Sequence, residues 1–160
     1  MKIQQQIRFI ALLLTGLYAG PAMYSLKGVA AAMKSMQPSA YAEFHQQLDF
    51  YMGVRMALYA KVTLALNVLL LIATIRTSDK RVLALTIAGF LLFFAEIFFT
   101  VSVNVPLNEK VQTWNIHHLP QQWEAVRDKW IRFDVIRSIC VMASFLVYLA
   151  AFQLSNRKSK

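Results

Sequence analysis

Residues 103–137, VNVPLNEKVQTWNIHHLPQQWEAVRDKWIRFDVIR, lie between two strongly apolar segments and form the most informative stretch of the chain. Five of them follow one another at steps of four, three, four and three: Trp123, Arg127, Trp130, Asp134 and Arg137. On an α-helix this spacing places all five on one face, the kind that packs against neighbouring helices. We call them the polar stripe. Their charges indicate either a polar pocket or a position at a membrane surface.

The composition favours a membrane protein. The chain has 160 residues, of which 58% are hydrophobic and 16% charged, and its mean hydropathy is +0.45. A soluble domain of this size cannot bury so much apolar surface. The formal charge of +9 does not indicate a nucleic-acid partner, because the basic residues flank apolar segments and form no stripe with interleaved aromatic residues.

Four apolar segments are each long enough to cross a membrane, which takes about 20 residues. They are expected at about residues 7–26, 56–75, 82–103 and 135–155. The first also resembles a signal peptide. Its apolar run continues past the small residues Gly20 and Ala22, and Pro21 argues against cleavage there, so we expect a retained helix with a kink.

Basic residues near the span ends predict the orientation. One side combines the N-terminal region, the short link between the second and third spans, and the tail, with Lys2, Arg8, Arg76, Lys80, Arg81, Arg157, Lys158 and Lys160. The other side holds two long connections, residues 27–55 and 104–134, which mix basic and acidic residues. We therefore expect both termini in the cytoplasm.

The two long connections have helical character. A helix that Ser39 can cap runs without proline into the second span, and Pro120 suits the first turn of a helix that continues into the fourth. At 1.5 Å per residue, each would project roughly 20 to 25 Å beyond the membrane. The sequence predicts an all-α, four-helix transmembrane bundle, one domain over residues 1–160, whose second and fourth helices extend beyond the outer membrane face.

Ionisable residues are expected in the outer leaflet on three different helices. Such groups are costly there and usually face the bundle interior in pairs. Glu96 begins a polar line with Thr100 and Asn104, and either Arg55 or Arg137 can neutralise it. The simplest interpretation is a structural ion pair, which is compatible with a pocket beside it.

A second polar face lies on the helix that enters the second span. It combines His45, Leu48, Met52, Arg55 and Tyr59. If it confronts the polar stripe, the outer half of the bundle encloses a cavity with aromatic walls and arginine donors, suited to a flat or anionic organic molecule. The alternative makes Trp130 an interfacial anchor and Arg137 a flanking residue that reaches the membrane surface.

Metal binding has weaker support. The three histidines, His45, His117 and His118, lie on the outer side, and Glu43 could join two of them as a third ligand. Adjacent histidines rarely reach one ion together, and the sequence has no HExxH or Glu-x-x-His pattern. We therefore expect exposed loop histidines, no metal and no organic cofactor. Cys140 is the single cysteine, which excludes a cysteine-based metal site.

Three motifs together are typical of one family. They are GLYAGP at residues 16–21, VNVPLN at residues 103–108 and WEAVRDKWIRFDVIR at residues 123–137. The chain resembles, over essentially its whole length, the small four-span membrane proteins that include the fungal anthrone oxygenases and many bacterial members of unknown function. Asp134 departs from the family pattern, in which His or Asn is common.

The resemblance implies that molecular oxygen oxidises an activated aromatic carbon without a classical cofactor. Such chemistry needs a base, groups that stabilise an anion, and a dry aromatic pocket. By this resemblance Arg127 and Arg137 stabilise the anion, and Asp134 or His117 takes the proton. The expected substrate contacts are Asn104, Asn108, Trp123, Trp130, Arg55, Tyr59 and Glu96.

Two functions remain open. The chain is either a membrane oxygenase that acts on a lipophilic, phenolic molecule, or a non-catalytic membrane protein that binds a lipid, a small ligand or a partner protein. A transporter is less favoured, because four spans with one glutamate do not supply a continuous polar pathway. Assembly into a homo-oligomer would change that judgement. The lipid bilayer is the partner common to all these interpretations.

Overall fold

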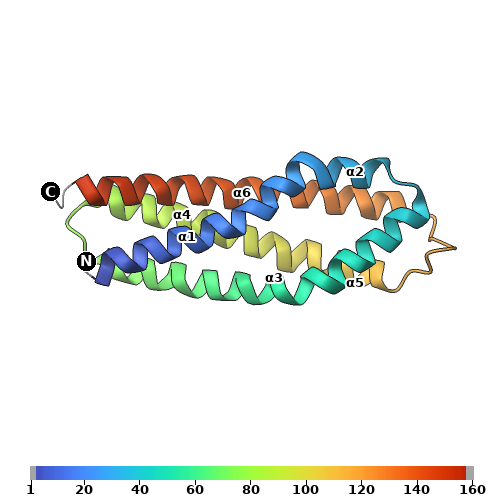
Figure 1. Cartoon of the computed structure of the whole chain (residues 1–160), viewed down its shortest axis with the longest axis horizontal. Helices are drawn as coiled ribbons and strands as arrows, with labels where there is room; N and C mark the ends of the chain where they lie inside the picture. Colours follow the sequence, from blue (N-terminus) through green and yellow to red (C-terminus); the bar gives the residue numbers. More distant parts are fainter. Residues whose placement is uncertain (1–2, 158–160) are drawn as a thin grey trace.

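The computed structural model describes residues 3–157 and shows an antiparallel bundle of four long helical segments (Figure 1). The segments comprise α1 (Ile3–Tyr24), the π-helical turn η1 (Ser25–Val29) and α2 (Ala30–Ser35); α3 (Pro38–Ile75); α4 (Lys80–Phe99), the π-helical turn η2 (Thr100–Asn104) and α5 (Val105–Gln112); and α6 (Trp123–Arg157). Each segment is long and apolar enough to cross a membrane. The predicted all-α, four-helix bundle is confirmed, and the chain is an integral membrane protein in contact with lipid.

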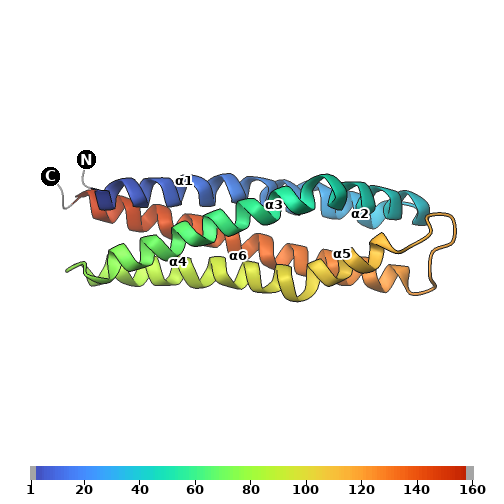
Figure 2. The same cartoon turned by 90° about the horizontal axis from the view of Figure 1, so that it is seen from below.

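Consecutive segments run in opposite directions. The first and last described residues lie at one end of the bundle, beside the short 76–79 link, and the 113–122 connection closes the other end (Figures 1 and 2). The basic residues that predicted the orientation therefore share one end wherever the structure describes them. Lys2, Lys158 and Lys160 lie outside the described residues.

All four helical segments are longer than the apolar spans. They contain 33 to 38 residues, and the first and third continue to Ser35 and Gln112, which the apolar runs alone did not indicate. Pro38 occupies the first turn of α3, so Ser39 is not its cap. Helix α6 begins at Trp123, after Pro120 rather than with it.

Close approach of the helices depends on two glycines. A Cβ atom on Gly89 would lie 2.7 Å from the ring of Tyr148, and one on Gly16 would lie 2.7 Å from the ring of Phe145. Both rings belong to α6, which thus packs tightly on α4 and α1. In a membrane, where burial of apolar surface does not drive association, small residues of this kind hold helices together.

Replacing Gly89 with alanine is expected to destabilise the bundle by about 1–3 kcal/mol, because the added methyl group overpacks against Tyr148. Denaturation of the purified protein in detergent measures the change. Gly20→Ala is the matched control, since no described atom lies within 4 Å of its added Cβ. Alanine there favours the helix by about 0.5–1 kcal/mol. Equal stabilities of the two variants would contradict the packing of Tyr148 on α4.

Candidate functional site

The polar stripe lies on the inward face of α6, as its spacing predicts. Arg127, Trp130 and Asp134 are buried, and Trp123 and Arg137 are partly buried. The helix thus presents two cations, a carboxylate and two indole rings to the interior of the bundle. What these groups can do depends on the partners that α1, α3, α4 and α5 bring to them.

Arg137 lies between two carboxylates. Its Nε and Nη2 donate to Asp134 Oδ1 at 3.0 and 2.8 Å, and its Nη1 donates to Glu96 Oε1 at 3.3 Å. Nη1 also donates to the Thr100 hydroxyl at 3.1 Å. Both carboxylate residues are 1% exposed. Of the two arginines that the sequence left open as partners of Glu96, Arg137 is the one that pairs with it.

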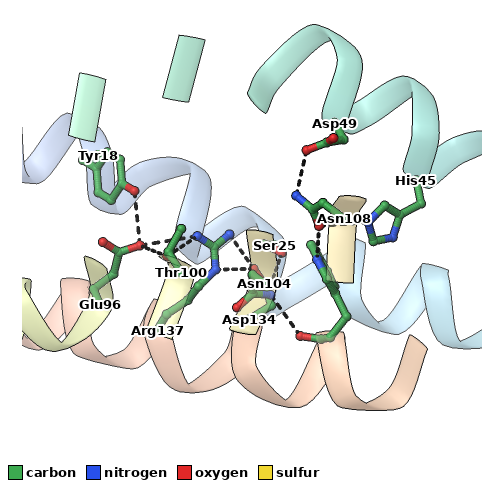
Figure 3. A network of polar contacts seen from close by, with 11 residues as sticks. Tyr18, Ser25, His45, Asp49, Glu96, Thr100, Asn104, Asn108, Asp134 and Arg137 are labelled. Carbon is green, nitrogen blue, oxygen red and sulfur yellow. Dashed lines mark hydrogen bonds and ion pairs between the residues drawn. The ribbon is translucent and has the colours of Figure 1, made fainter. Parts of the chain in front are cut away.

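Three hydroxyl groups complete this arrangement (Figure 3). Tyr18 and Thr100 donate to Glu96 Oε1 at 3.1 and 2.9 Å, and Ser25 donates to Asp134 Oδ2 at 2.6 Å. Four donors therefore surround two buried carboxylates. We call the group the charged cluster; its members are Tyr18, Ser25, Glu96, Thr100, Asp134 and Arg137.

Both π-helical turns border the charged cluster. Ser25 is the first residue of η1 and Thr100 the first residue of η2, so each turn supplies one hydroxyl to a carboxylate. Turns of this type are rare and occur frequently at functional sites. The sequence analysis missed both turns, as well as the roles of Tyr18 and Ser25. The charged cluster is the strongest candidate site in the described part of the chain.

A second cluster, around Asn108, lies beside the charged cluster (Figure 3). Asn108 Oδ1 accepts from Trp130 Nε1 at 2.6 Å and from His45 Nε2 at 3.1 Å, and Asn108 Nδ2 donates to Asp49 Oδ1 at 2.7 Å. The Tyr41 hydroxyl donates to His45 Nδ1 at 3.0 Å. We call Tyr41, His45, Asp49, Asn108 and Trp130 the aromatic cluster. It joins α3, α5 and α6.

His45 corrects the expectation of exposed loop histidines. It lies within α3, before the apolar segment 56–75, and is only 1% exposed. Burial lowers the pKa of its ring, because the imidazolium form is poorly solvated there. The neutral ring has one donor and one acceptor, so we assign Nε2–H as the donor to Asn108 and Nδ1 as the acceptor from Tyr41.

His117 and His118 occupy a different place. Both are exposed in the 113–122 connection, where they line a shallow depression of about 620 Å³ at the end of the bundle. His117 is exposed, whereas Asp134 is buried within α6, and the described contacts of Asp134 do not include His117, so the structure does not bring His117 to the charged cluster as a base. Within residues 3–157, no three His, Cys, Asp or Glu side chains form a group that could hold a metal ion.

The predicted aromatic cavity is filled by its own walls. The ring centroids of His45 and Trp130 are 4.9 Å apart, and those of Tyr41 and Trp123 are 5.8 Å apart. The Arg127 guanidinium lies 4.8 Å from the Trp123 ring centroid. The polar stripe and α3 therefore do confront each other, but their rings touch. A ligand can enter only if these side chains move.

The other residues of the polar face predicted on α3 differ in exposure: some point into the bundle and others lie on its surface. Met52 and Arg55 are exposed, and Arg55 donates to a backbone carbonyl of its own helix, so neither joins the site. Tyr59 turns toward α1, where it stacks on Tyr18 with ring centroids 5.9 Å apart and donates to the Leu14 carbonyl at 3.2 Å. It therefore reaches the charged cluster only through Tyr18.

Asn104 lies between the two clusters (Figure 3). Its Nδ2 donates to the Trp130 carbonyl at 3.4 Å, while its Oδ1 has no hydrogen-bond partner among the described residues. Glu96 Oε2 is likewise buried without a described partner. The free Glu96 oxygen can accept a proton, the free Asn104 oxygen can accept a hydrogen bond from a hydroxyl group, and the partly buried Arg137 can stabilise an anion formed beside Glu96.

Comparison with known proteins identifies one family. Residues 48–147 match the family model described as anthrone oxygenase. No curated protein and no solved structure matches the chain. The matched region contains Glu96, Asn104, Asn108, Asp134 and Arg137, whereas the hydroxyl donors on the first helical segment precede it.

Proposed function

Because the chain belongs to the anthrone oxygenase family, we propose that it is a membrane oxygenase that oxidises a lipophilic phenolic molecule with molecular oxygen. The observation that carries the proposal is Arg137, held between two buried carboxylates of which Glu96 keeps one oxygen unpaired. A base and a cation in a water-poor interior are what the formation of an electron-rich aromatic anion requires.

We place the charged cluster near the outer boundary of the membrane. Helix α3 has 38 residues, which correspond to about 57 Å, whereas the hydrocarbon core is about 30 Å thick. The end that carries the termini is rich in basic residues, which favours the cytoplasmic side of a bacterial plasma membrane. The opposite end, with the aromatic cluster, then extends beyond the outer face.

The reaction uses these groups in a fixed order. Glu96 Oε2 takes a proton from the activated ring CH₂ group, and Arg137 stabilises the resulting anion. The anion reduces O₂ and forms a carbon–oxygen bond to it, which gives a peroxide that recovers the proton from Glu96. Loss of water from the hydroperoxide leaves a ring carbonyl. The balance is one CH₂ group and one O₂ in, one carbonyl and one water out.

The other residues of the site bind and orient. Asn104 Oδ1 is free to accept from a phenolic hydroxyl, and Trp123 and Trp130 can stack on the ring once their present partners move aside. Asp134 has both oxygens bonded, by Arg137 and by Ser25, so we assign it to positioning Arg137 rather than to proton abstraction. Neither Arg55 nor His117 has a role in this scheme.

Oxygen uptake tests the proposal. The purified protein in lipid nanodiscs, supplied with an anthrone as the probe, is expected to consume one O₂ for each quinone formed, faster than empty nanodiscs do. An oxygen electrode and product analysis measure both quantities. Uptake no faster than with empty nanodiscs, for a range of anthrones and related phenols, would refute the oxygenase assignment.

The ring contacts of the aromatic cluster support a second candidate function. Since the rings of His45 and Trp130 touch, they fill the space that a ligand would need, as side chains do in a protein core. A non-catalytic lipid-binding or ligand-binding protein would consume no oxygen. It would show only a raised unfolding temperature when an anthrone or a lipid is added.

A further inference from the structure

Several buried polar groups lie between the charged cluster and the end that carries the termini. Within residues 3–157, the buried side-chain atoms without a hydrogen-bond partner include Thr15 Oγ1, both amide atoms of Asn67, the Tyr148 hydroxyl, Arg8 Nε and Glu96 Oε2. Thr15 and Asn67 are 0% exposed and Tyr148 is 2% exposed. Buried polar groups normally have partners, so a set of this size needs a physical explanation.

Other polar side chains of the same interior are satisfied. Thr63, Thr74 and Thr86 each donate to the backbone carbonyl four residues earlier in their own helices. Ser144 donates across the interface to the Gly89 carbonyl at 2.7 Å. The unpaired groups are therefore a distinct subset, contributed by α1, α3, α4 and α6.

Contacts between α1 and α6 place Tyr148 and Thr15 at neighbouring levels along the bundle axis. Phe9 contacts Phe152, with ring centroids 6.4 Å apart, and Gly16 lies against Phe145. Tyr148 lies between these two α6 residues and belongs to the same buried apolar cluster as Ala11 and Leu12 of α1 and Leu70 of α3, so its hydroxyl is the polar atom of an otherwise apolar group. Thr15 belongs to the stretch of α1 between Phe9 and Gly16 and points inward.

Contacts between α1 and α3 place the others. Gln4 donates to the Ala73 carbonyl, and Tyr59 donates to the Leu14 carbonyl. Asn67 lies between the two α3 residues and thus faces α1 between Gln4 and Leu14, the stretch that contains Arg8. At the other end, Thr15 precedes Tyr18 by one helical turn, and the Tyr18 hydroxyl binds Glu96. These contacts give the order of the unpaired groups along the bundle, from Arg8 and Asn67 through Tyr148 and Thr15 to Glu96, and we call this series the file.

We propose that this file holds internal water molecules, which connect Glu96 to the bundle end that carries both termini. Water fits because the file offers hydroxyl, phenol and amide groups that both donate and accept, and a buried water makes about three such bonds. An ion fits poorly, since no described charged side chain faces the interior between Arg8 and Glu96, and Lys61 at this depth is exposed. One buried water per about 27 residues is usual, so several in this bundle are expected.

The water file goes beyond the proposed oxygenase and does not depend on it. It would give Glu96 contact with water from the termini side whether or not the charged cluster performs chemistry. The water file can therefore be tested without substrate. A negative result in the oxygen-uptake experiment would not change the outcome of that test.

Water-to-protein magnetisation transfer in solid-state NMR is the experiment. The full chain, with ¹⁵N-asparagine and ¹³C-glutamate, is placed in lipid bilayers; the Asn67 side-chain signal is assigned by its loss in Asn67→Leu. Transfer from water to the Asn67 amide and the Glu96 carboxyl is expected to build up nearly as fast as transfer to Asn115, which is exposed. A build-up several-fold slower at Asn67 would overturn the proposal.

Paired variants keep the conclusion specific. Thr15→Val together with Tyr148→Phe removes two hydroxyls and preserves shape. It is expected to slow transfer to Glu96 several-fold, while transfer to Asn67, which lies on the termini side of both residues, stays fast. Ser144→Ala is the matched control, because its hydroxyl bonds to a carbonyl and not to the file. Equal transfer to Glu96 in the double variant and the control would refute the file. If the double variant does not fold, Tyr148→Phe alone is expected to show a smaller slowing, and an unchanged build-up there would also refute it.

Discussion

Replacing Arg137 with alanine is expected to lower the free energy of unfolding by about 3–5 kcal/mol, because it leaves two buried carboxylates without their shared cation. Glu96 and Asp134 are each 1% exposed, so bulk solvent does not solvate either carboxylate once the guanidinium is lost. Chemical denaturation in detergent micelles measures the change, and tryptophan fluorescence reports it, since Trp130 lies about two helical turns from Arg137 on the same face.

Two further variants make that result interpretable. Arg132→Ala, on the exposed side of the same helix, is expected to change stability by no more than about 0.5 kcal/mol. The double variant Arg137→Met with Glu96→Leu is expected to recover part of the loss, since apolar residues can replace a buried ion pair at little cost. A cost for Arg137→Ala no larger than that for Arg132→Ala would contradict the buried pairing.

The second large effect is expected at Glu96. Glu96→Gln should lower substrate-dependent oxygen uptake by about 100- to 10,000-fold, because an amide cannot take the proton that forms the anion. Glutamine keeps the shape of glutamate, and its carbonyl oxygen can still accept from Tyr18 and Thr100, whose hydroxyls now bind Glu96 Oε1. Oxygen electrode measurements in nanodiscs give the rate, and circular dichroism with gel filtration establishes that the bundle is folded.

Glu109→Gln is the control for this substitution, because Glu109 is exposed on α5. It should leave the rate of oxygen uptake unchanged. If Glu96→Gln also retained the full rate, Glu96 would not be the base and the reaction scheme would fail. If neither variant nor the native chain consumed oxygen, the non-catalytic alternative would stand.

The helices and the polar stripe could be predicted from the sequence because the alternatives, apolar runs in water and charged side chains in lipid, cost much free energy. A chain with four long apolar runs has no soluble alternative, and its charged residues at membrane depth must turn inward. For that reason the inward face of α6 and the involvement of Glu96 were predictable. The choice of Arg137 over Arg55 was not, because both positions are compatible with the spacing.

The hydroxyl donors of the charged cluster on α1 and η1 could not be predicted from the sequence, for a reason particular to membrane proteins. In α1 the side that faces lipid is as apolar as the side that faces the core, so hydrophobic periodicity does not identify the inward residues. Tyr18 and Ser25 therefore looked like ordinary members of an apolar run. For His45 the sequence supported two expectations, an exposed histidine and a member of the face that meets the polar stripe, because a histidine beyond the span is compatible with either solvent or interior. Its contact with Trp130 decides for the second.

The π-helical turn η2 divides the third helical segment into two parts of different helical phase. Before it, inward residues recur at the usual steps, at Gly89, Phe93 and Glu96; from Glu96 the next are Thr100 and Asn104, two successive steps of four. An uncompensated extra residue would rotate everything beyond it by about 100°. Because η2 absorbs that residue, Glu96 and Asn104 can both face inward. Without η2, Asn104 would turn away from the face that carries Glu96, and the outer part of the segment would present a different side to α6.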